Sequence, residues 1–429
     1  MKSAICILGA AVGLFLSGIS PNAAQEMKPA AALSLQDCIN IALKNQNDVI
    51  LARNNVTIAR ANSTQAKSAY FPQLSIQNNA FVTGSDGVLT EQRTGTALTV
   101  TQNIFDGGLR EAQVKGARYG VTESRAGLTR VVQVVVFDVT QTYYDTLRAE
   151  RLADVARANV NYNEGLYELI QARVNAGDAA QVDILPVESQ LANARVNLVA
   201  AENDFRTAKV QLQNTMGLSP QTEFAIQDVG PLPEMKIDPL DSYLAGALNN
   251  RPDIQESKAG VGIAKSSVKA ARISLYPRPA IAGRYERGVG GLSGTSSQII
   301  GGFTFDLFNG GRNQAVYKEA KALEANALQR ASQVNKDIEA QVQQAYLNLT
   351  SAGERVAASE IGLQAAQKNY DAQNAKYKQG LAIPLDLLNA EVQLVTAQTV
   401  AVNARYDHYA AIAQLDFAVG KYGGFNGKE

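Results

Sequence analysis

The sequence predicts a mainly α-helical fold with a membrane β-barrel, in which long coiled-coil-like helices pack sideways on other helices and each chain adds four β-strands. Three observations predict it. The chain repeats itself once, each repeat contains a proline-free stretch too long for a compact domain, and each repeat contains two segments in which apolar and polar residues alternate.

The first residues have the pattern of a secretory signal peptide. Lys2 precedes an apolar run from Ala4 to Leu16, and the small residues Ala23 and Ala24 follow. The run is shorter than the roughly 18 residues that a membrane-spanning helix needs. We therefore expect residues 1–24 to be a signal peptide cleaved near Ala24, and the mature chain to leave the cytoplasm.

The rest of the chain is an internal duplication. Residues 42–48 match residues 247–253, which lie 205 positions later, and residues 104–108 match residues 307–311, which lie 203 positions later. The change of offset indicates a loss of two residues between Pro277 and Leu307. Because insertions and deletions concentrate in exposed loops, we expect a loop tip there.

The duplication sets the expected boundaries. The first repeat covers residues 25–218, with a helix, strands at 73–84 and 94–105, a long helix at 108–176 and a helix at 180–216. A linker at 219–239 follows, and its prolines argue against a regular element. The second repeat covers residues 240–421, with a helix, strands at 279–288 and 297–308, a long helix at 311–379 and a helix at 384–419, before a tail at 422–429.

The expected strands have the weak alternation that is typical of membrane barrels. Pro72 and Pro277 end the preceding helices and favour extended backbone. Over about ten residues one face of each strand is apolar and the other polar, although a soluble hairpin would look the same. Four strands cannot close a membrane barrel, since the smallest have about eight, so the barrel interpretation requires several chains to share one wall.

The two long helices are expected to pack sideways on other helices. No proline occurs at 108–177 or at 311–380, and at about 1.5 Å per residue each stretch would reach roughly 100 Å. Apolar and small residues recur at spacings of four and three from Ile338 to Tyr370, which is a heptad seam. A coiled-coil rod gives the same seam, but the export signal, the strands and the duplication favour a barrel.

Composition argues against several classes of function. Lysine plus arginine equals aspartate plus glutamate at 40 each, so nothing suggests a nucleic-acid partner. Cys38 is the one cysteine left after the signal peptide, and His408 is the sole histidine. With no cluster at metal-ligand spacing, no phosphate-binding loop and no nucleophile elbow, we expect no enzyme activity, no catalytic residue, no metal and no cofactor.

The chain resembles the TolC-like outer-membrane efflux proteins over essentially its whole mature length. The resemblance rests on the duplicated order of elements, on the helix ends at 70–72 and 275–277, on the strand-to-helix turns at 105–108 and 308–311, and on residues 380–391. It implies a homotrimer in which four strands from each chain complete a shared twelve-stranded barrel. The barrel would lie in the outer membrane of a Gram-negative-type cell, among outer-membrane lipid, and continue into the periplasm as a helical tunnel.

The resemblance implies an export channel for efflux or type I secretion. Substrates would pass from a periplasmic adaptor, a membrane fusion protein, and an inner-membrane pump of RND or ABC type to the cell exterior. Drugs, metals and proteins all remain open as cargo. The alternative is a periplasmic coiled-coil adaptor or scaffold without a pore, but such an adaptor would pair one helical hairpin with a lipoyl-like β-domain, whereas this chain has two hairpins and four strands.

The resemblance also assigns residues to the periplasmic tip. Asp183, Asp386 and Asn389 would line the tunnel entrance, where rings of acidic side chains favour cations, although each aspartate could instead cap the helix that follows it. Glycine at these turns also supplies left-handed backbone, so a structural role is open beside a contact role. The turns expected to dock the adaptor are Asn175, Ala176, Gly177 and Asp178 in the first repeat, and Gln379, Gly380, Leu381 and Ala382 in the second.

Overall fold

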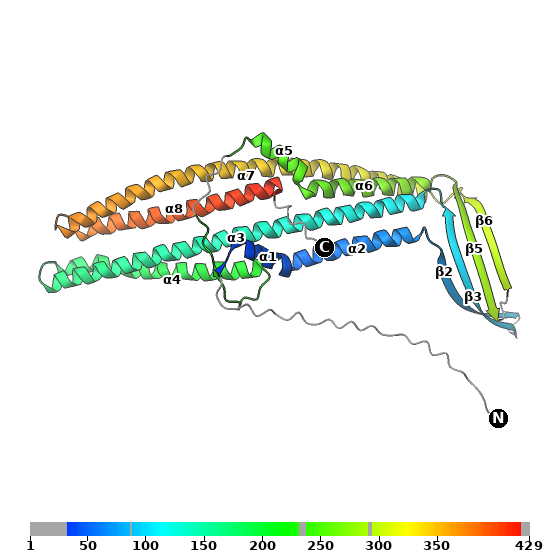
Figure 1. The fold of residues 1–429 in the computed structure, drawn as a ribbon, viewed down its shortest axis with the longest axis horizontal. Helices are drawn as coiled ribbons and strands as arrows, with labels where there is room; N and C mark the ends of the chain where they lie inside the picture. The colour runs from blue at the N-terminus through cyan, green and yellow to red at the C-terminus, as the bar shows by residue number, and fades with distance from the viewer. Residues whose placement is uncertain (1–31, 86–87, 231–236, 291–293, 422–429) are drawn as a thin grey trace, which may run out of the picture.

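The protein is long and narrow, with helices along its length and a β-sheet at one end (Figure 1). The computed structural model describes residues 32–85, 88–230, 237–290 and 294–421. The expected signal peptide and the expected tail at 422–429 lie outside the described residues.

The elements occur in the same order in both repeats. The first repeat contains β1 (Ala32–Leu33), α1 (Leu35–Asn45), α2 (Asn47–Ser68), β2 (Gln73–Ser85), β3 (Val88–Phe105), α3 (Leu109–Asn175), the short 3-10 helix η1 (Gln181–Asp183) and α4 (Ile184–Thr215). After β4 (Ala225–Ile226), the second repeat contains α5 (Leu240–Asn250), α6 (Pro252–Ile273), β5 (Arg278–Gly290), β6 (Gly294–Thr304), α7 (Arg312–Lys378) and α8 (Pro384–Val419).

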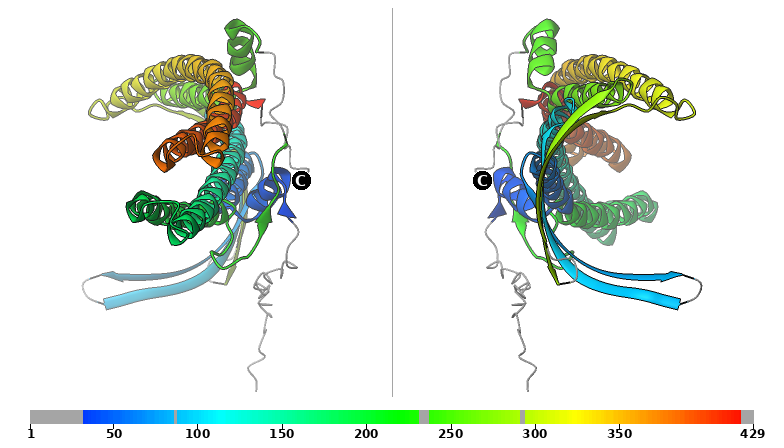
Figure 2. Two further views of the ribbon diagram at one scale, coloured as in Figure 1. Left: turned by 90° about the vertical axis from the view of Figure 1, so that its left-hand side faces the viewer. Right: turned by 90° about the vertical axis from the view of Figure 1, so that its right-hand side faces the viewer.

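The helices form one layer whose order changes along the molecule. In the half away from the sheet the order is α7, α8, α3 and α4, and in the half next to the sheet it is α7, α6, α3 and α2 (Figure 1). The 67-residue helices α3 and α7 therefore run through both halves, and pairs of shorter helices lie beside them. Seen along the long axis, the helices follow one open curve (Figure 2). None of the described helices is apolar enough over a sufficient length to cross a membrane.

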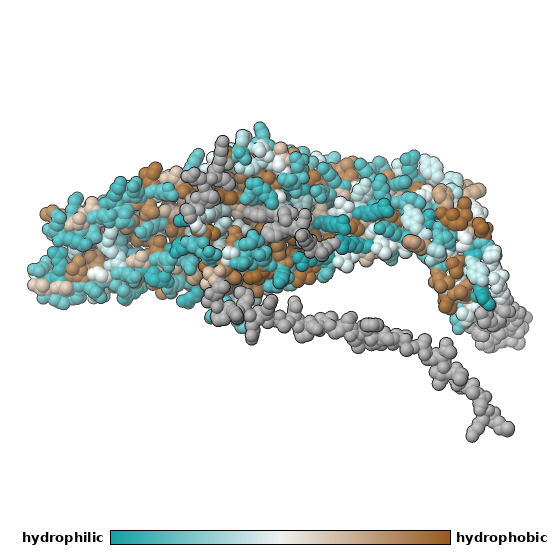
Figure 3. Space-filling view, in the orientation of Figure 1, coloured by the Kyte–Doolittle hydropathy of each residue, from teal (hydrophilic) through white to brown (hydrophobic). Residues whose placement is uncertain are grey.

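The sheet is antiparallel, in the order β2-β3-β5-β6. Its central pair joins the two repeats, with Leu98 of β3 opposite Arg287 of β5, and β2 and β6 are its edges. Exposed apolar side chains are concentrated here, including Ile76 (72% exposed), Ile299 (82%) and Phe303 (77%). Figure 3 shows hydrophobic surface, in brown, over the strands.

The structure differs from the sequence prediction at several element ends. β3 starts at Val88 rather than 94, although residues 91–93 are polar and interrupt the alternation. β6 ends at Thr304 rather than 308, because its partner β5 begins at Arg278, opposite Thr304, and offers no residue beyond. Within the linker, β4 is a two-residue strand that pairs with β1 despite the neighbouring prolines.

The core consists of separate clusters along the layer rather than one centre. The cluster midway along the molecule joins α1, α3, α4 and the linker around Tyr143, which is 1% exposed and donates a hydrogen bond to the Leu33 carbonyl oxygen at 3.2 Å. A second cluster packs α5 against α7 and α8. A third, near the far turns, contains Leu166, Ile184, Tyr377 and Leu388 and joins both helical hairpins.

Candidate functional site

The turn between α3 and α4 lies at the tip opposite the sheet, and a glycine with left-handed backbone ends α3 there. Gly177 has a φ of 83°, in the left-handed region that side chains disfavour. The Asp178 amide donates to the Arg173 carbonyl at 2.8 Å, and the Gly177 amide to that of Val174 at 3.0 Å. This pair of bonds is a Schellman motif, which satisfies the last carbonyls of the helix.

The turn between α7 and α8 repeats this geometry. Gly380 has a φ of 74°, the Leu381 amide donates to the Lys376 carbonyl at 2.9 Å, and the Gly380 amide donates to that of Tyr377 at 3.0 Å. Nothing lies within 4 Å of a Cβ built on either turn glycine, so the backbone angle, not space, requires glycine here.

The two turns lie close together at this tip (Figure 1). Most of the expected docking residues are exposed: Asn175, Ala176, Gly177, Asp178, Gln379, Gly380 and Leu381. Ala382 is half-buried against the core cluster near the turns. The fold therefore presents both turns to solvent on one end of the molecule.

The two expected entrance aspartates have different surroundings. Asp183 ends η1, and its Oδ2 accepts a hydrogen bond from the Ala180 amide at 3.2 Å, as a capping carboxylate does. Asp386 lies in the first turn of α8 and is exposed. Asn389, three residues further on the same helix face, is also exposed.

Two contacts between the repeats near the tip were not assigned by sequence reasoning. The Arg173 guanidinium of α3 lies over the Tyr377 ring of α7, 5.5 Å from its centre. Asn163 of α3 donates a hydrogen bond from Nδ2 to Glu391 Oε1 of α8 at 2.7 Å, and both side chains are buried. The duplication pairs Glu391 with Glu188, but sequence spacing alone does not reveal that Asn163 lies opposite.

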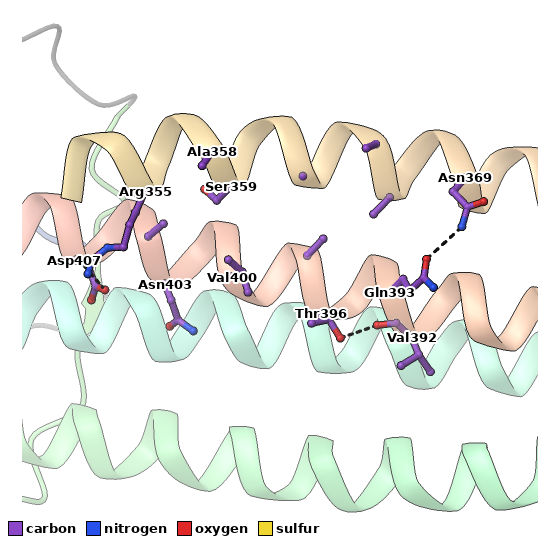
Figure 4. Close-up of a pocket in the computed structure, with 15 residues that line it drawn as sticks. Arg355, Ala358, Ser359, Asn369, Val392, Gln393, Thr396, Val400, Asn403 and Asp407 are labelled. Atoms are coloured by element: carbon purple, nitrogen blue, oxygen red, sulfur yellow. Dashed lines mark hydrogen bonds and ion pairs between the residues drawn. The ribbon is translucent and has the colours of Figure 1, made fainter. Parts of the chain in front are cut away.

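A groove of about 970 Å³ runs between α7 and α8 (Figure 4). At one end Arg355 and Asp407 form an ion pair at 3.6 Å, and Asp407 also binds Arg148 of α3 at 3.2 Å. Small residues form much of the remaining wall, including Ser359, Gly362, Ala366 and Ala397. In the part of the chain that the structure describes, no group of three or more His, Cys, Asp or Glu side chains could hold a metal.

Comparison with known proteins gives one consistent result. The family described as "Outer membrane efflux protein" matches residues 38–218 and 244–421. The outer membrane efflux protein BepC of Brucella suis is 27% identical over 399 residues, covering 91% of this chain and 86% of that protein. The alkaline protease secretion protein AprF of Pseudomonas aeruginosa is 24% identical, and the match covers 91% of this chain and 85% of that protein.

Solved structures have the same fold. The Campylobacter jejuni CmeC outer membrane channel superposes with a TM-score of 0.81 at 18% identity, covering 92% of this chain and 87% of that chain. The outer membrane protein VceC of Vibrio cholerae gives a TM-score of 0.79 at 18% identity, and the match covers 90% of this chain and 96% of that chain.

Proposed function

This chain belongs to the outer membrane efflux protein family, and from that premise we propose that three copies close one tunnel, each supplying a third of its wall. The chain is an outer-membrane efflux channel subunit, with a helical wall and a β-domain. The single observation that carries the trimer proposal is the contact between α3 and α8, which joins the two repeats within a chain. The equivalent surfaces, on α7 and on α4, lie at the two outer edges of the chain and have no such contact among the described residues.

The outer face of α4 is the first of these edges. Positions 203 residues apart are equivalent, so α4 corresponds to α8. Leu185 of α4 is 60% exposed, whereas its equivalent Leu388 of α8 is 6% exposed in a cluster with α3. Val210 is 47% exposed, and its equivalent Ala413 only 3%. The apolar side chains that α8 buries are thus left exposed on α4, which supports a partner for α4.

The groove between α7 and α8 is the second edge. Asn163 of α3 contacts α8 by its hydrogen bond to Glu391. The residue equivalent to Asn163 on α7 is Ala366, which lines the groove. A second copy could therefore place its α4 against α7 as α8 lies against α3. The sheet supports the same closure. The inner pair joins the second strand of one repeat, β3, to the first strand of the other, β5, and the equivalent pair would join β6 to β2 of the next copy. Three copies with four strands each would give a barrel of twelve strands.

Cysteine cross-linking tests this closure. The variant that combines Glu188→Cys with Ala366→Cys places thiols where the proposal brings neighbouring copies together, and oxidation is expected to give covalent dimers and trimers on a denaturing gel. Asn163→Cys with Glu391→Cys is the matched control, since that pair lies within one chain and should yield only monomers. A Glu188–Ala366 double variant that stays monomeric in native membranes would contradict the trimer.

We also propose roles for the tip. Asp183, Asp386 and Asn389 line the tunnel entrance, and the two exposed turns around Gly177 and Gly380 dock a periplasmic adaptor that connects to an inner-membrane pump. Support comes from the exposure of both turns on one end and from relatives named for protease secretion and for pyoverdine export. Photo-cross-linking from position 178 or 381 should capture the adaptor in whole cells, whereas the same probe at position 354, midway along α7, should not.

A further inference from the structure

Glu391 is a buried acid at the junction between the two repeats. It is 3% exposed on α8, and its Oε1 accepts a hydrogen bond at 2.7 Å from Asn163 of α3, which is fully buried. The Asn163 amide nitrogen also lies 2.9 Å from the Asn159 carbonyl oxygen in the preceding turn of α3. These contacts hold the Asn163 amide group in one orientation.

The pair leaves two oxygens without partners. Neither Glu391 Oε2 nor Asn163 Oδ1 has a hydrogen-bond partner among the described residues, although both atoms are buried. An ionised carboxylate can only accept hydrogen bonds, so it cannot satisfy the amide oxygen beside it. A protonated carboxyl group has one O–H donor. A single proton on Oε2 would therefore give both oxygens a partner.

The surroundings of Glu391 do not favour a negative charge. Among the described residues, the titratable groups that interact with it are Tyr162 on α3 and Tyr370 on α7, and burial raises the pKa of both hydroxyls, so they are neutral at neutral pH. Where α4 meets α8, its buried side chains Ile184 and Val187 are apolar. Burial raises the pKa of Glu391 to about 8, against the opposing effect of the Asn163 hydrogen bond.

The duplication shows that this pair is not a general property of the repeat. Glu188 is the equivalent acid of the first repeat, and it is exposed on α4. The residue equivalent to Asn163 in the second repeat is Ala366, which has no amide. The buried acid and its amide partner therefore occur together only where α8 meets α3 within one chain.

We propose that Glu391 is held as the neutral carboxylic acid and that its O–H donates a hydrogen bond to Asn163 Oδ1, so that a two-hydrogen-bond acid–amide pair joins α3 to α8. Loss of the proton removes one of these bonds and leaves a buried charge on which no cation acts among the described residues. The junction near the tip is then proton-dependent. An effect on the tunnel itself rests on the proposed function, but the protonation state does not.

The sign of the pH dependence follows from the raised pKa. The folded protein binds the proton more tightly than the unfolded chain, whose carboxyl group has a pKa near 4.5. The stabilising contribution is fully present below about pH 4.5 and is lost as the pH rises through about 8. Within that window the folded-to-unfolded ratio falls by up to about tenfold per pH unit from this group alone.

Infrared difference spectroscopy on the purified full-length protein tests the protonation directly. Wild type should show the carbonyl stretch of a protonated carboxyl group at pH 6, and this signal should disappear as the pH rises above about 8. Glu391→Gln, which retains both hydrogen bonds as an amide–amide pair, should lack the signal, and Glu354→Gln, which replaces an exposed acid on α7, should retain it. A wild-type spectrum at pH 6 identical to that of Glu391→Gln would overturn the proposal.

Two further measurements separate pairing from simple burial. In Asn163→Ala the carboxyl signal should shift in frequency, because the hydrogen-bonded partner is gone, and an unshifted signal would refute the pair. The unfolding temperature of wild type should fall between pH 5 and pH 8 by more than that of Glu391→Gln, and equal changes would also refute it. None of these readouts needs conduction or trimer closure, so they can succeed even if the cross-linking test fails.

Discussion

At the residue scale, the tip combines two fixed backbone turns with an exposed acid, Asp386. The left-handed glycines Gly177 and Gly380 end α3 and α7 through the same hydrogen bonds, so the two turns are held alike. The acids beside them are not alike, because Asp183 caps η1 whereas Asp386 is exposed on the first turn of α8. Asp386 is therefore the better probe of the proposed entrance charge, since α8 has no side-chain capping bond for its replacement to remove.

Replacing Asp386 with Asn should reduce the preference of the channel for cations. In the proposed trimer, three copies around one axis lose three negative charges, so the ratio of potassium to chloride permeability should fall by roughly twofold or more at low salt. Reversal potentials across planar bilayers under a salt gradient measure this. Glu354→Gln, the same loss of charge midway along α7, should leave the potential unchanged, and an unchanged Asp386→Asn channel would remove this residue from the entrance.

At the scale of elements, the heptad seam of α7 was readable from the sequence, but its partners were not. Ile338, Val342 and Leu349 follow the expected spacing and are buried against α5 and α8. Spacing along one helix says which face is apolar, not which distant helix covers it. The meeting of Asn163 with Glu391 depends on contacts 228 positions apart, so it could not be predicted.

Other limits of the sequence prediction have local causes. The helix before each sheet segment is two helices, with extended backbone at Gln46 and at Arg251. Arg251 is 1% exposed, and its guanidinium binds Asp253 at 2.5 Å and the Gln341 side chain of α7 at 2.8 Å. The burial of Arg251 is a tertiary feature that its position in the sequence does not reveal. The break itself has a local signal, because Pro252 disfavours helical backbone at Arg251 and begins α6.

Leu349→Ala should destabilise the protein by about 2–5 kcal/mol, because it opens a cavity in a packed seam. Leu349 is 0% exposed, and Leu347, only two positions away on the same helix, is 54% exposed. Leu347→Ala is therefore the matched control and should change stability far less in isolated chains. Thermal unfolding followed by circular dichroism compares them, and equal losses would show that the seam is not packed as described.

At the scale of the whole molecule, the sheet end of the layer is suited to lipid. Its strands expose large apolar side chains such as Ile76, Ile299 and Phe303, whereas the turns at the other end expose polar residues and glycine together with Leu381. Because an open sheet edge is not tolerated in hydrocarbon, the proposed trimer requires β2 and β6 to pair with neighbouring copies before or during insertion. We therefore expect membrane insertion and the association of copies to be coupled.

Ile299→Lys should impair membrane insertion. Ile299 is 82% exposed on β6, and a lysine on a lipid-facing strand position costs about 2–4 kcal/mol at the bilayer centre and less near its surfaces. Gln298→Lys, one position earlier and hence on the opposite face, is the control. The amount of heat-resistant oligomer in isolated outer membranes measures the effect, and equal yields from the two variants would place Ile299 away from lipid.

The open curve of the helical layer has a consequence for biogenesis. In a closed ring of three chains, half of the junctions between repeats lie within a single chain. These junctions form intramolecularly, because α3 and α8 belong to one polypeptide and meet at a fixed effective concentration. The other half depend on encounters between molecules, so their formation slows as the protein becomes scarce. At low concentration, newly exported copies would persist as incomplete rings whose edges expose apolar side chains. The expression level, rather than the folding rate of each chain, would then determine how many channels assemble.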